Sequence, residues 1–121
     1  MTKTILTIED NERNRMLMKD ILVYRGYNVI EAANGKEGIE IAFSRKPDLI
    51  FLDMQMPVMD GFAALKELRS NSELNDIKIV AVTSFAMKGD REKILAAGAD
   101  DYISKPIDTR ALPELVKKYI G

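Results

Sequence analysis

The chain contains no cysteine, no histidine and no tryptophan among its 121 residues. Without cysteine, disulfide bonds and thiolate metal sites are excluded. Without histidine, the most common metal ligand and the most common general base are both missing. Any chemistry on this chain must therefore use carboxylates, lysine, hydroxyl groups or a bound cation.

Long apolar runs and an excess of charge of one sign are also absent. No run of about 18 apolar residues occurs, and the apolar part of the opening sequence MTKTILTIED is too short for a signal peptide. The 18 basic and 19 acidic side chains give a net charge of −1, and no basic tract is present. We therefore expect a cytoplasmic protein that has neither nucleic acid nor a membrane as a partner.

The length of 121 residues suits one domain, and 46% hydrophobic with 31% charged residues is an ordinary globular composition. No repeat, linker or low-complexity segment divides the chain, so a single domain over residues 1–121 is predicted. Strand-like and helix-like patterns alternate along it. Strands are predicted at about residues 4–8, 28–32, 49–52, 77–84 and 101–104, and helices at about residues 11–25, 35–44, 62–69, 88–97 and 108–119.

Five successive strand–helix units predict a parallel sheet with helices on both faces, because parallel strands need crossover connections. The apolar runs that begin at Leu49 and Ile79 fit central strands buried on both sides. In such sheets, ligands bind beyond the carboxyl ends of the strands, where the strand order reverses. Apolar residues at helical spacing are expected to face the core: Leu17, Ile21 and Leu22 in the first helix, and Phe62, Leu65 and Leu68 in the third.

Side chains that can carry chemistry stand at the ends of four predicted strands. Glu9 and Asp10 follow the first strand, Asp53 ends the third, Thr83 ends the fourth and Lys105 follows the fifth. Two carboxylates about 5 Å apart repel each other by roughly 3 kcal/mol at an effective dielectric constant of 20. An all-oxygen site of this kind suits a hard cation such as Mg²⁺, and a carboxylate can also act as a nucleophile that accepts a phosphoryl group.

Each of these residues also has an ordinary structural interpretation. Glu9 and Asp10 favour a helix N-terminus, with Asp10 or Asn11 as the capping residue. Asp53 can be a solvated loop acid and Lys105 a solvated surface charge, while threonine is common in strands. The joint arrangement at successive strand ends is harder to explain in this way than any single member, and it favours a functional site.

Four motifs lie at these strand ends: IEDN at residues 8–11, LDMQMPVMDG at 52–61, AVTS at 81–84 and DYISKP at 101–106. With them, the chain resembles the receiver domain of two-component response regulators over nearly its whole length. The stretch FAMKGD at residues 85–90 is similar to stand-alone receivers of the DivK type and to receivers in hybrid kinases. The resemblance implies a CheY-like, flavodoxin-like α/β fold: a doubly wound five-stranded parallel sheet in the order 2-1-3-4-5, with five helices.

The resemblance also implies a role for each residue of the site. Asp53 would accept a phosphoryl group from a phosphohistidine on a histidine kinase or histidine phosphotransfer protein. Asp10 and Asp53 would bind Mg²⁺, for which Mn²⁺ can substitute, together with the backbone carbonyl of Gln55 and with Glu9 through water. Lys105 would pair first with the carboxylate and then with the phosphoryl group.

A switch is implied as well. Thr83 would move towards the phosphoryl group, Tyr102 would change rotamer, and the surface of the fourth helix, fifth strand and fifth helix would then bind a downstream protein target. Gln55 and Phe85 would tune dephosphorylation, and because Phe85 is apolar and cannot orient water, we expect a long-lived phosphoryl group. The Lys105–Pro106 peptide bond is expected to be cis, a form that is essentially confined to proline.

Several functions are consistent with this pattern. The first is a stand-alone, monomeric signalling switch that phosphorylates and dephosphorylates itself but is not a turnover enzyme. The second is a receiver domain excised from a hybrid histidine kinase or a larger regulator. The third is a Mg²⁺-dependent aspartate-nucleophile phosphatase, which needs a second acid at the position of Gln55. The fourth, a flavin carrier, is opposed by the acidic edge of the sheet.

Overall fold

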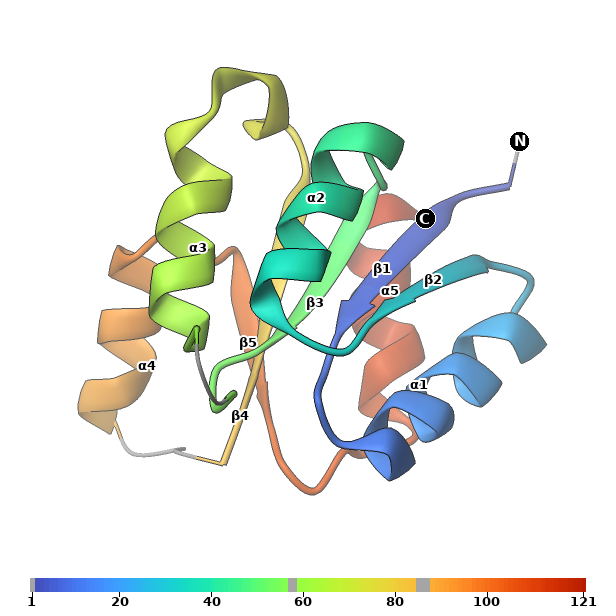
Figure 1. Ribbon diagram of the computed structural model, residues 1–121. Coiled ribbons are helices and arrows are strands. Elements are labelled where there is room, and N and C mark those ends of the chain that lie inside the picture. The colour runs from blue at the N-terminus through green and yellow to red at the C-terminus, as the bar shows by residue number, and fades with distance from the viewer. Residues whose placement is uncertain (1, 57–58, 85–87) are drawn as a thin grey trace.

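Strands and helices alternate through residues 2–56, 59–84 and 88–121, which are the residues that the computed structural model describes (Figure 1). The strands are β1 (Thr4–Ile8), β2 (Asn28–Ala32), β3 (Leu49–Asp53), β4 (Lys78–Thr83) and β5 (Asp101–Ser104). The helices are α1 (Glu12–Tyr24), α2 (Gly35–Arg45), α3 (Gly61–Ser70), α4 (Lys88–Ala96) and α5 (Ala111–Ile120), with a short 3-10 turn η1 (Ser72–Leu74).

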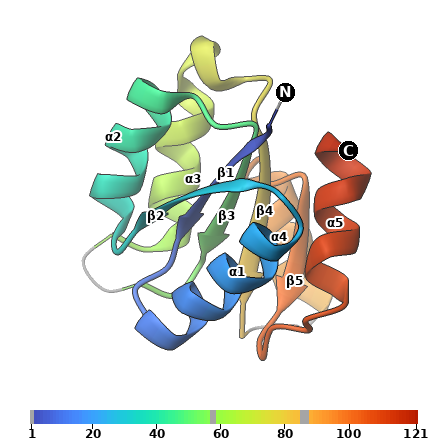
Figure 2. The ribbon, with the colours of Figure 1, turned by 90° about the vertical axis from the view of Figure 1, so that its right-hand side faces the viewer.

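The strands pair in parallel to form one sheet in the order β2-β1-β3-β4-β5. Helices α1 and α5 cover one face, and α2 and α3 cover the other (Figure 2). The predicted flavodoxin-like, doubly wound fold is thereby confirmed. The order reverses between β1 and β3, and this is the point where such sheets form ligand sites.

The central strand β3 shows why the sheet needs helices on both faces. Leu49 and Phe51 pack into the core under α1 and α5, whereas Ile50 and Leu52 pack into the core under α2 and α3. All four are buried, so no side of the strand is left for polar residues until the strand ends. Burying each such side chain contributes roughly 1.5–3 kcal/mol. Asp53 is the first charged residue of the strand.

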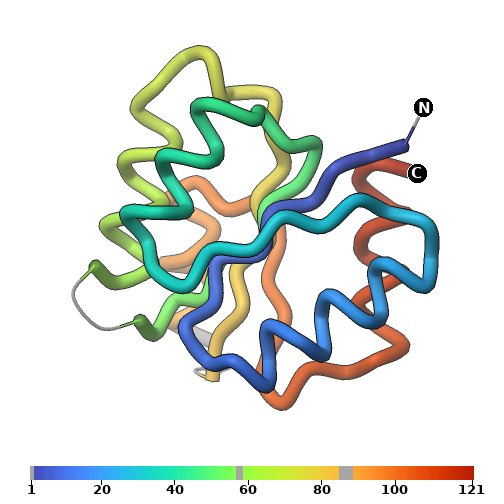
Figure 3. The backbone as a smooth tube through the Cα atoms, turned by 45° about the vertical axis from the view of Figure 1, so that its right-hand side comes forward, coloured from blue at the N-terminus to red at the C-terminus, as the bar shows by residue number. Residues whose placement is uncertain are grey.

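The strand register aligns the carboxyl ends of β1, β3 and β4. Ile8 lies opposite Leu52, and Asp53 lies opposite Val82. Glu9, one residue beyond Ile8, therefore emerges beside Asp53 at the same edge of the sheet. Figure 3 shows that the two chain termini lie at the other end of the molecule.

The start of α3 packs closely against the end of β3. Asp60 caps the helix by accepting a hydrogen bond from Ala63 N–H at 2.9 Å. Gly61 donates its N–H to Met54 O at 3.2 Å, and a Cβ atom at this glycine would overlap with Met54 Cα. Asp60 thus serves as the helix cap, and Gly61 after it is a position that has no room for a side chain.

The structure differs from the prediction at the start of α5. The helix begins at Ala111 instead of about residue 108, because the Asp108 carboxylate accepts hydrogen bonds from the N–H groups of Arg110 at 2.8 Å and Ala111 at 3.3 Å. Asp108 therefore forms the turn before the helix. The Lys105–Pro106 peptide bond that precedes this turn is cis, as expected.

Candidate functional site

Three carboxylates lie together at the carboxyl ends of β1 and β3. Glu9 and Asp53 are each 1% exposed, whereas Asp10 is open to solvent. One carboxylate oxygen from each of the three lies within 4.8 Å of the others. The structure thus brings together the three acids that the strand-end pattern selected.

The ammonium group of Lys105 reaches this acidic cluster from the loop after β5. Its Nζ lies 3.1 Å from Asp53 Oδ1 and 3.4 Å from Glu9 Oε1. Because β4 separates β5 from β3, the lysine side chain crosses the end of the intervening strand. One ammonium group cannot balance three carboxylates, so the cluster has an excess of negative charge that favours a cation.

The unused oxygen atoms of the cluster fit a metal ion. Asp53 Oδ1 accepts a hydrogen bond from Gln55 N–H at 2.9 Å, but Asp53 Oδ2 is buried without a hydrogen-bond partner among the described residues. Glu9 Oε1 is also buried and forms an ion pair with Lys105, but it has no hydrogen-bond partner among the described residues. A divalent cation would compensate such buried oxygens, and carboxylate oxygen is the ligand that Mg²⁺ prefers.

The protonation of the cluster follows from its burial. Burial first, and then the neighbouring Asp53 carboxylate, raise the pKa of Glu9 from 4.5 to about 7. Burial alone raises the pKa of Asp53, but contacts with Glu9, Gln55 N–H and Lys105 outweigh it and hold that pKa below its ordinary value. Burial likewise lowers the pKa of Lys105, and the two carboxylates more than reverse this. Near neutral pH, Asp53 is therefore ionised, whereas Glu9 is close to the midpoint of its titration.

Arg15, on helix α1, holds the backbone of Glu9 in place. Its Nη1 donates to Glu9 O at 2.9 Å, and its Nε donates to the Glu31 carboxylate at 3.1 Å. Glu9 N–H donates to Ala32 O at 3.0 Å, so both backbone groups of Glu9 are held. The α1 cap is Asn11, whose side chain accepts from Asn14 N–H; the Asp10 carboxylate is therefore left for the site.

Thr83 lies at the end of β4, where it is fully buried. The side-chain amide of Gln55 donates from Nε2 to Thr83 Oγ1 at 3.1 Å and accepts at Oε1 from Ser84 N–H at 2.9 Å. Gln55 therefore joins the loop after β3 to the end of β4. Phe85, predicted to tune dephosphorylation, lies outside the described residues.

The sequence as a whole matches a known family. The profile of the response regulator receiver domain matches residues 5–117. The chain belongs to this family. It is therefore a receiver domain of the two-component response regulators, as the four motifs predicted.

Relatives of this receiver agree with the assignment. The polar-differentiation response regulator DivK of Brucella anthropi is 42% identical over 121 residues, which cover 100% of this chain and 98% of DivK. The DivK of Brucella ovis has the same identity and coverage. These similarities confirm the predicted likeness to the DivK type.

Solved structures give the same result. The receiver domain of a sensor histidine kinase from Pseudomonas aeruginosa has a TM-score of 0.91 and 34% identity, and covers 100% of this chain and 99% of that one. That structure has a magnesium ion coordinated in its active-site cleft. The chemotaxis protein CheY4 of Vibrio cholerae has a TM-score of 0.93 and 27% identity, and covers 99% of this chain and 100% of that one.

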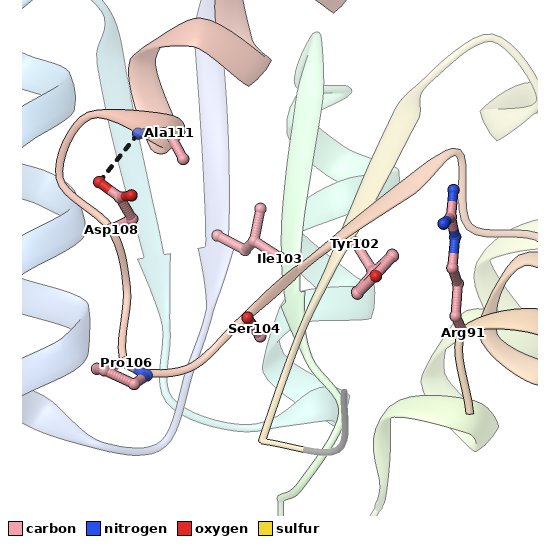
Figure 4. Close-up of a pocket in the computed structure, with 7 residues that line it drawn as sticks. All are labelled: Arg91, Tyr102, Ile103, Ser104, Pro106, Asp108 and Ala111. Atoms are coloured by element: carbon pink, nitrogen blue, oxygen red, sulfur yellow. Dashed lines mark hydrogen bonds between the residues drawn. The ribbon is translucent and has the colours of Figure 1, made fainter. Parts of the chain in front are cut away.

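This receiver also has a groove of about 490 Å³ between α4, β5 and the start of α5 (Figure 4). Tyr102 is half-buried and lines the groove, as do Ser104 and Asp108. The Arg91 guanidinium group of α4 lies over the Tyr102 ring, 5.4 Å from its centroid. A change in the Tyr102 rotamer would therefore alter both the groove and the position of Arg91.

In the described ranges of the receiver, no helix has both the length and the apolar character needed to cross a bilayer.

Two residues around the site escaped prediction from the sequence. Arg15 contacts Glu9 O and the Glu31 carboxylate, and Arg91 contacts the Tyr102 ring, although charged residues on helices usually face solvent. The only available signal for Arg15 was its position on the first turn of the helix after IEDN, close to the acidic pair. For Arg91, the sequence carries no such signal.

Proposed function

We propose that this receiver accepts a phosphoryl group on Asp53 from a phosphohistidine of a histidine kinase or histidine phosphotransfer protein, and signals by altered binding to a downstream protein. One observation carries the proposal. The Asp53 carboxylate is buried beside Glu9 and Asp10, with the Lys105 ammonium 3.1 Å from Oδ1 and with Oδ2 lacking a hydrogen-bond partner among the described residues. Asp53 is thus held ionised between a cation site and a fixed positive charge.

Mg²⁺ is the cofactor in this proposal, with Mn²⁺ as a substitute. Asp10 and Asp53 would hold it directly, the backbone carbonyl of Gln55 would be a third ligand, and Glu9 would act through water. When bound, the ion would neutralise part of the charge on the phosphoryl oxygens. The two buried carboxylate oxygens that lack hydrogen bonds from the described residues support this assignment.

In the transfer, an Asp53 oxygen forms a bond to phosphorus while the bond between phosphorus and the donor histidine nitrogen breaks. The electron pair of the broken bond stays on that nitrogen. The Lys105 ammonium turns from the carboxylate to the phosphoryl oxygens, which carry more charge. The Thr83 hydroxyl moves to donate a hydrogen bond to one of these oxygens.

The signal would leave the site through Tyr102. Phosphorylation adds roughly −1.5 to −2 units of charge and three strong acceptors. Movement of Thr83 towards them would free space next to Tyr102, which packs against the core and lines the groove between α4 and α5. The face formed by α4, β5 and α5 would then bind its protein target differently.

We propose that the protein is a switch and not a turnover enzyme. An aspartate-nucleophile phosphatase needs a second acid two residues after its nucleophile, and this chain has Gln55 there. The amide cannot serve as a general acid, and it is bonded to Thr83 and Ser84. The long phosphoryl lifetime expected from Phe85 stays a prediction, as do the cytoplasmic location, the monomeric state and the absence of a nucleic-acid partner.

The test is the intact mass of the protein after incubation with acetyl phosphate. We expect a single phosphoryl adduct with Mg²⁺, and none when a chelator replaces the ion. Asp53→Asn should show no adduct. The matched control is Asp60→Asn, because asparagine caps a helix as well as aspartate and Asp60 lies outside the cluster. An adduct that is independent of Mg²⁺, or that persists in Asp53→Asn, would refute the proposal.

A further inference from the structure

One side chain at the site contacts both the phosphoacceptor loop and the end of β4. Gln55 donates its backbone N–H to Asp53 Oδ1 at 2.9 Å. Its side chain crosses to β4, where Nε2 donates to Thr83 Oγ1 at 3.1 Å and Oε1 accepts from Ser84 N–H at 2.9 Å. Both ends of the amide are therefore used, and they bind two consecutive residues.

The orientation of the amide follows from these partners. A backbone N–H can only donate, so the atom that faces Ser84 N–H must be the carbonyl oxygen of the Gln55 side chain. The NH₂ group then faces Thr83 Oγ1, and the threonine oxygen is the acceptor in this bond. The opposite orientation would place two donors together at Ser84.

This geometry opposes the movement that the proposed function requires of Thr83. A Thr83 hydroxyl that moves towards a phosphoryl group on Asp53 would either lengthen its bond with Gln55 Nε2 or pull the Gln55 amide away from Ser84 N–H. The Ser84 backbone, held by the same side chain, limits how far the end of β4 can follow. Because Gln55 N–H binds the Asp53 carboxylate, the same residue is also in direct contact with the group that becomes phosphorylated.

We propose that the Gln55 side chain is a latch, a positioning residue that holds Thr83 and the end of β4 in the unphosphorylated arrangement. It acts through Thr83 and is separate from any effect of Gln55 on water attack. The inference rests on the proposed function, since it concerns the step that follows phosphorylation. Its prediction is that loss of the amide makes activation easier.

The experiment uses beryllofluoride with Mg²⁺ as a mimic of the phosphoryl group, and follows the Thr83 methyl and Tyr102 ring signals by NMR. Gln55→Met has a similar size but no amide. We expect it to bind beryllofluoride roughly three- to tenfold more tightly, which is the effect of one ordinary hydrogen bond. Without the mimic, its Thr83 methyl signal should already be shifted towards the bound position.

The second variant and a double-mutant cycle separate this latch from a general structural role. Gln55→Asn retains the amide but is too short to reach both partners, so it should also bind the mimic more tightly. In the Thr83→Val background, Gln55→Met should have little effect on the affinity, because the hydroxyl that it holds is gone. A merely structural Gln55 would weaken binding in both backgrounds.

The outcomes are distinct. If the wild-type protein does not bind beryllofluoride, or if Asp53→Asn binds it as tightly as the wild type, the proposed function is wrong. The inference about the latch is then wrong as well. If the wild type binds it through Asp53 but both Gln55 variants bind it equally or more weakly, only the latch is wrong. An equal effect of Gln55→Met with and without the Thr83 hydroxyl would also refute it.

Discussion

Lys105 Nζ lies 3.1 Å from Asp53 Oδ1, although β4 separates the strands from which the two residues come. Both side chains are largely shielded from water, with 18% of the lysine side chain and none of the aspartate side chain exposed. A charge pair in such surroundings is sensitive to the loss of either member, because the remaining charge is left uncompensated. Loss of the lysine charge should therefore have opposite effects on the transfer of a phosphoryl group and on the binding of Mg²⁺.

Lys105→Met should slow phosphorylation of Asp53 by acetyl phosphate at least about tenfold, because the charge that stabilises the transferring group is lost. The same variant should bind Mg²⁺ more tightly at pH 8, because a neighbouring positive charge is removed. Titration of Mg²⁺ and intact-mass time courses measure the two effects. Lys118→Met, which alters an exposed ion pair with Asp101, should change neither. Weaker Mg²⁺ binding in Lys105→Met would contradict this account.

Glu9 makes stability depend on pH. The pKa of Glu9 is about 7 in the folded protein and 4.5 when unperturbed, so the folded state binds more protons between these values. The free energy of unfolding without Mg²⁺ should therefore fall as pH rises from about 4.5 to about 7, and then level off. The lowered pKa of Asp53 acts below this window. In urea unfolding, Glu9→Gln should remove most of the fall; an unchanged pH profile would show that Glu9 is not responsible.

Arg15 and Lys19 provide a matched pair for testing whether the hydrogen bond to Glu9 O supports Mg²⁺ binding at the acidic cluster. Both pair with Glu31, but only Arg15 also donates to the backbone carbonyl of Glu9. Arg15→Ala should weaken Mg²⁺ binding about tenfold, which is typical for removal of a group that orients a metal ligand. Lys19→Ala should leave the affinity unchanged. Equal losses in both variants would trace the effect to Glu31 and not to the Glu9 carbonyl.

Arg91 should hold the ring of Tyr102 in its present place. An exposed interaction of this kind contributes about 0.5–1 kcal/mol, so Arg91→Ala should change the ratio of Tyr102 rotamers about two- to fivefold. Side-chain coupling constants of Tyr102 measure that ratio by NMR. Lys118→Ala removes a similar contact over Tyr119, 5.2 Å from its centroid, and is the control. A Tyr102 ratio that responds equally to both variants would mean that the Arg91 contact has no specific role.

The sequence predicted the sheet well because its strands have strong local signals. Strands β1, β2 and β5 have the predicted bounds, since each is a short apolar or β-branched run between turn residues. The turn η1 was not predicted, because a single turn of three residues has no periodicity to detect. The strand-end acids and Lys105 could be found because parallel strands align their carboxyl ends at one edge.

Helix faces were predicted less accurately. Phe62 was expected in the core but is 41% exposed, because the buried stripe of α3 runs through Gly61, Ala64, Leu65 and Leu68. In α1, Leu17 was also expected in the core, but the helix buries Met18 and Leu22 and leaves Leu17 37% exposed. A shift of one position turns a helical residue by about 100°, so small errors in phase move a side chain out of the core.

The polar contacts around the site were beyond prediction. The bond between Gln55 and Thr83 joins residues 28 apart in the chain, and that between Arg15 and Glu31 joins residues 16 apart. Neither has a local pattern. Both depend on the distances between strand ends and loops that only the packed fold determines.

The most direct test of the account is to locate the phosphoryl group. After incubation with acetyl phosphate and Mg²⁺, borohydride reduces an aspartyl phosphate to homoserine, which peptide mass spectrometry can assign to one residue. We predict homoserine at position 53 alone. Modification at Asp10, Glu9 or another acid, with Asp53 unmodified, would contradict the claim that the buried acid beside Lys105 is the phosphoacceptor.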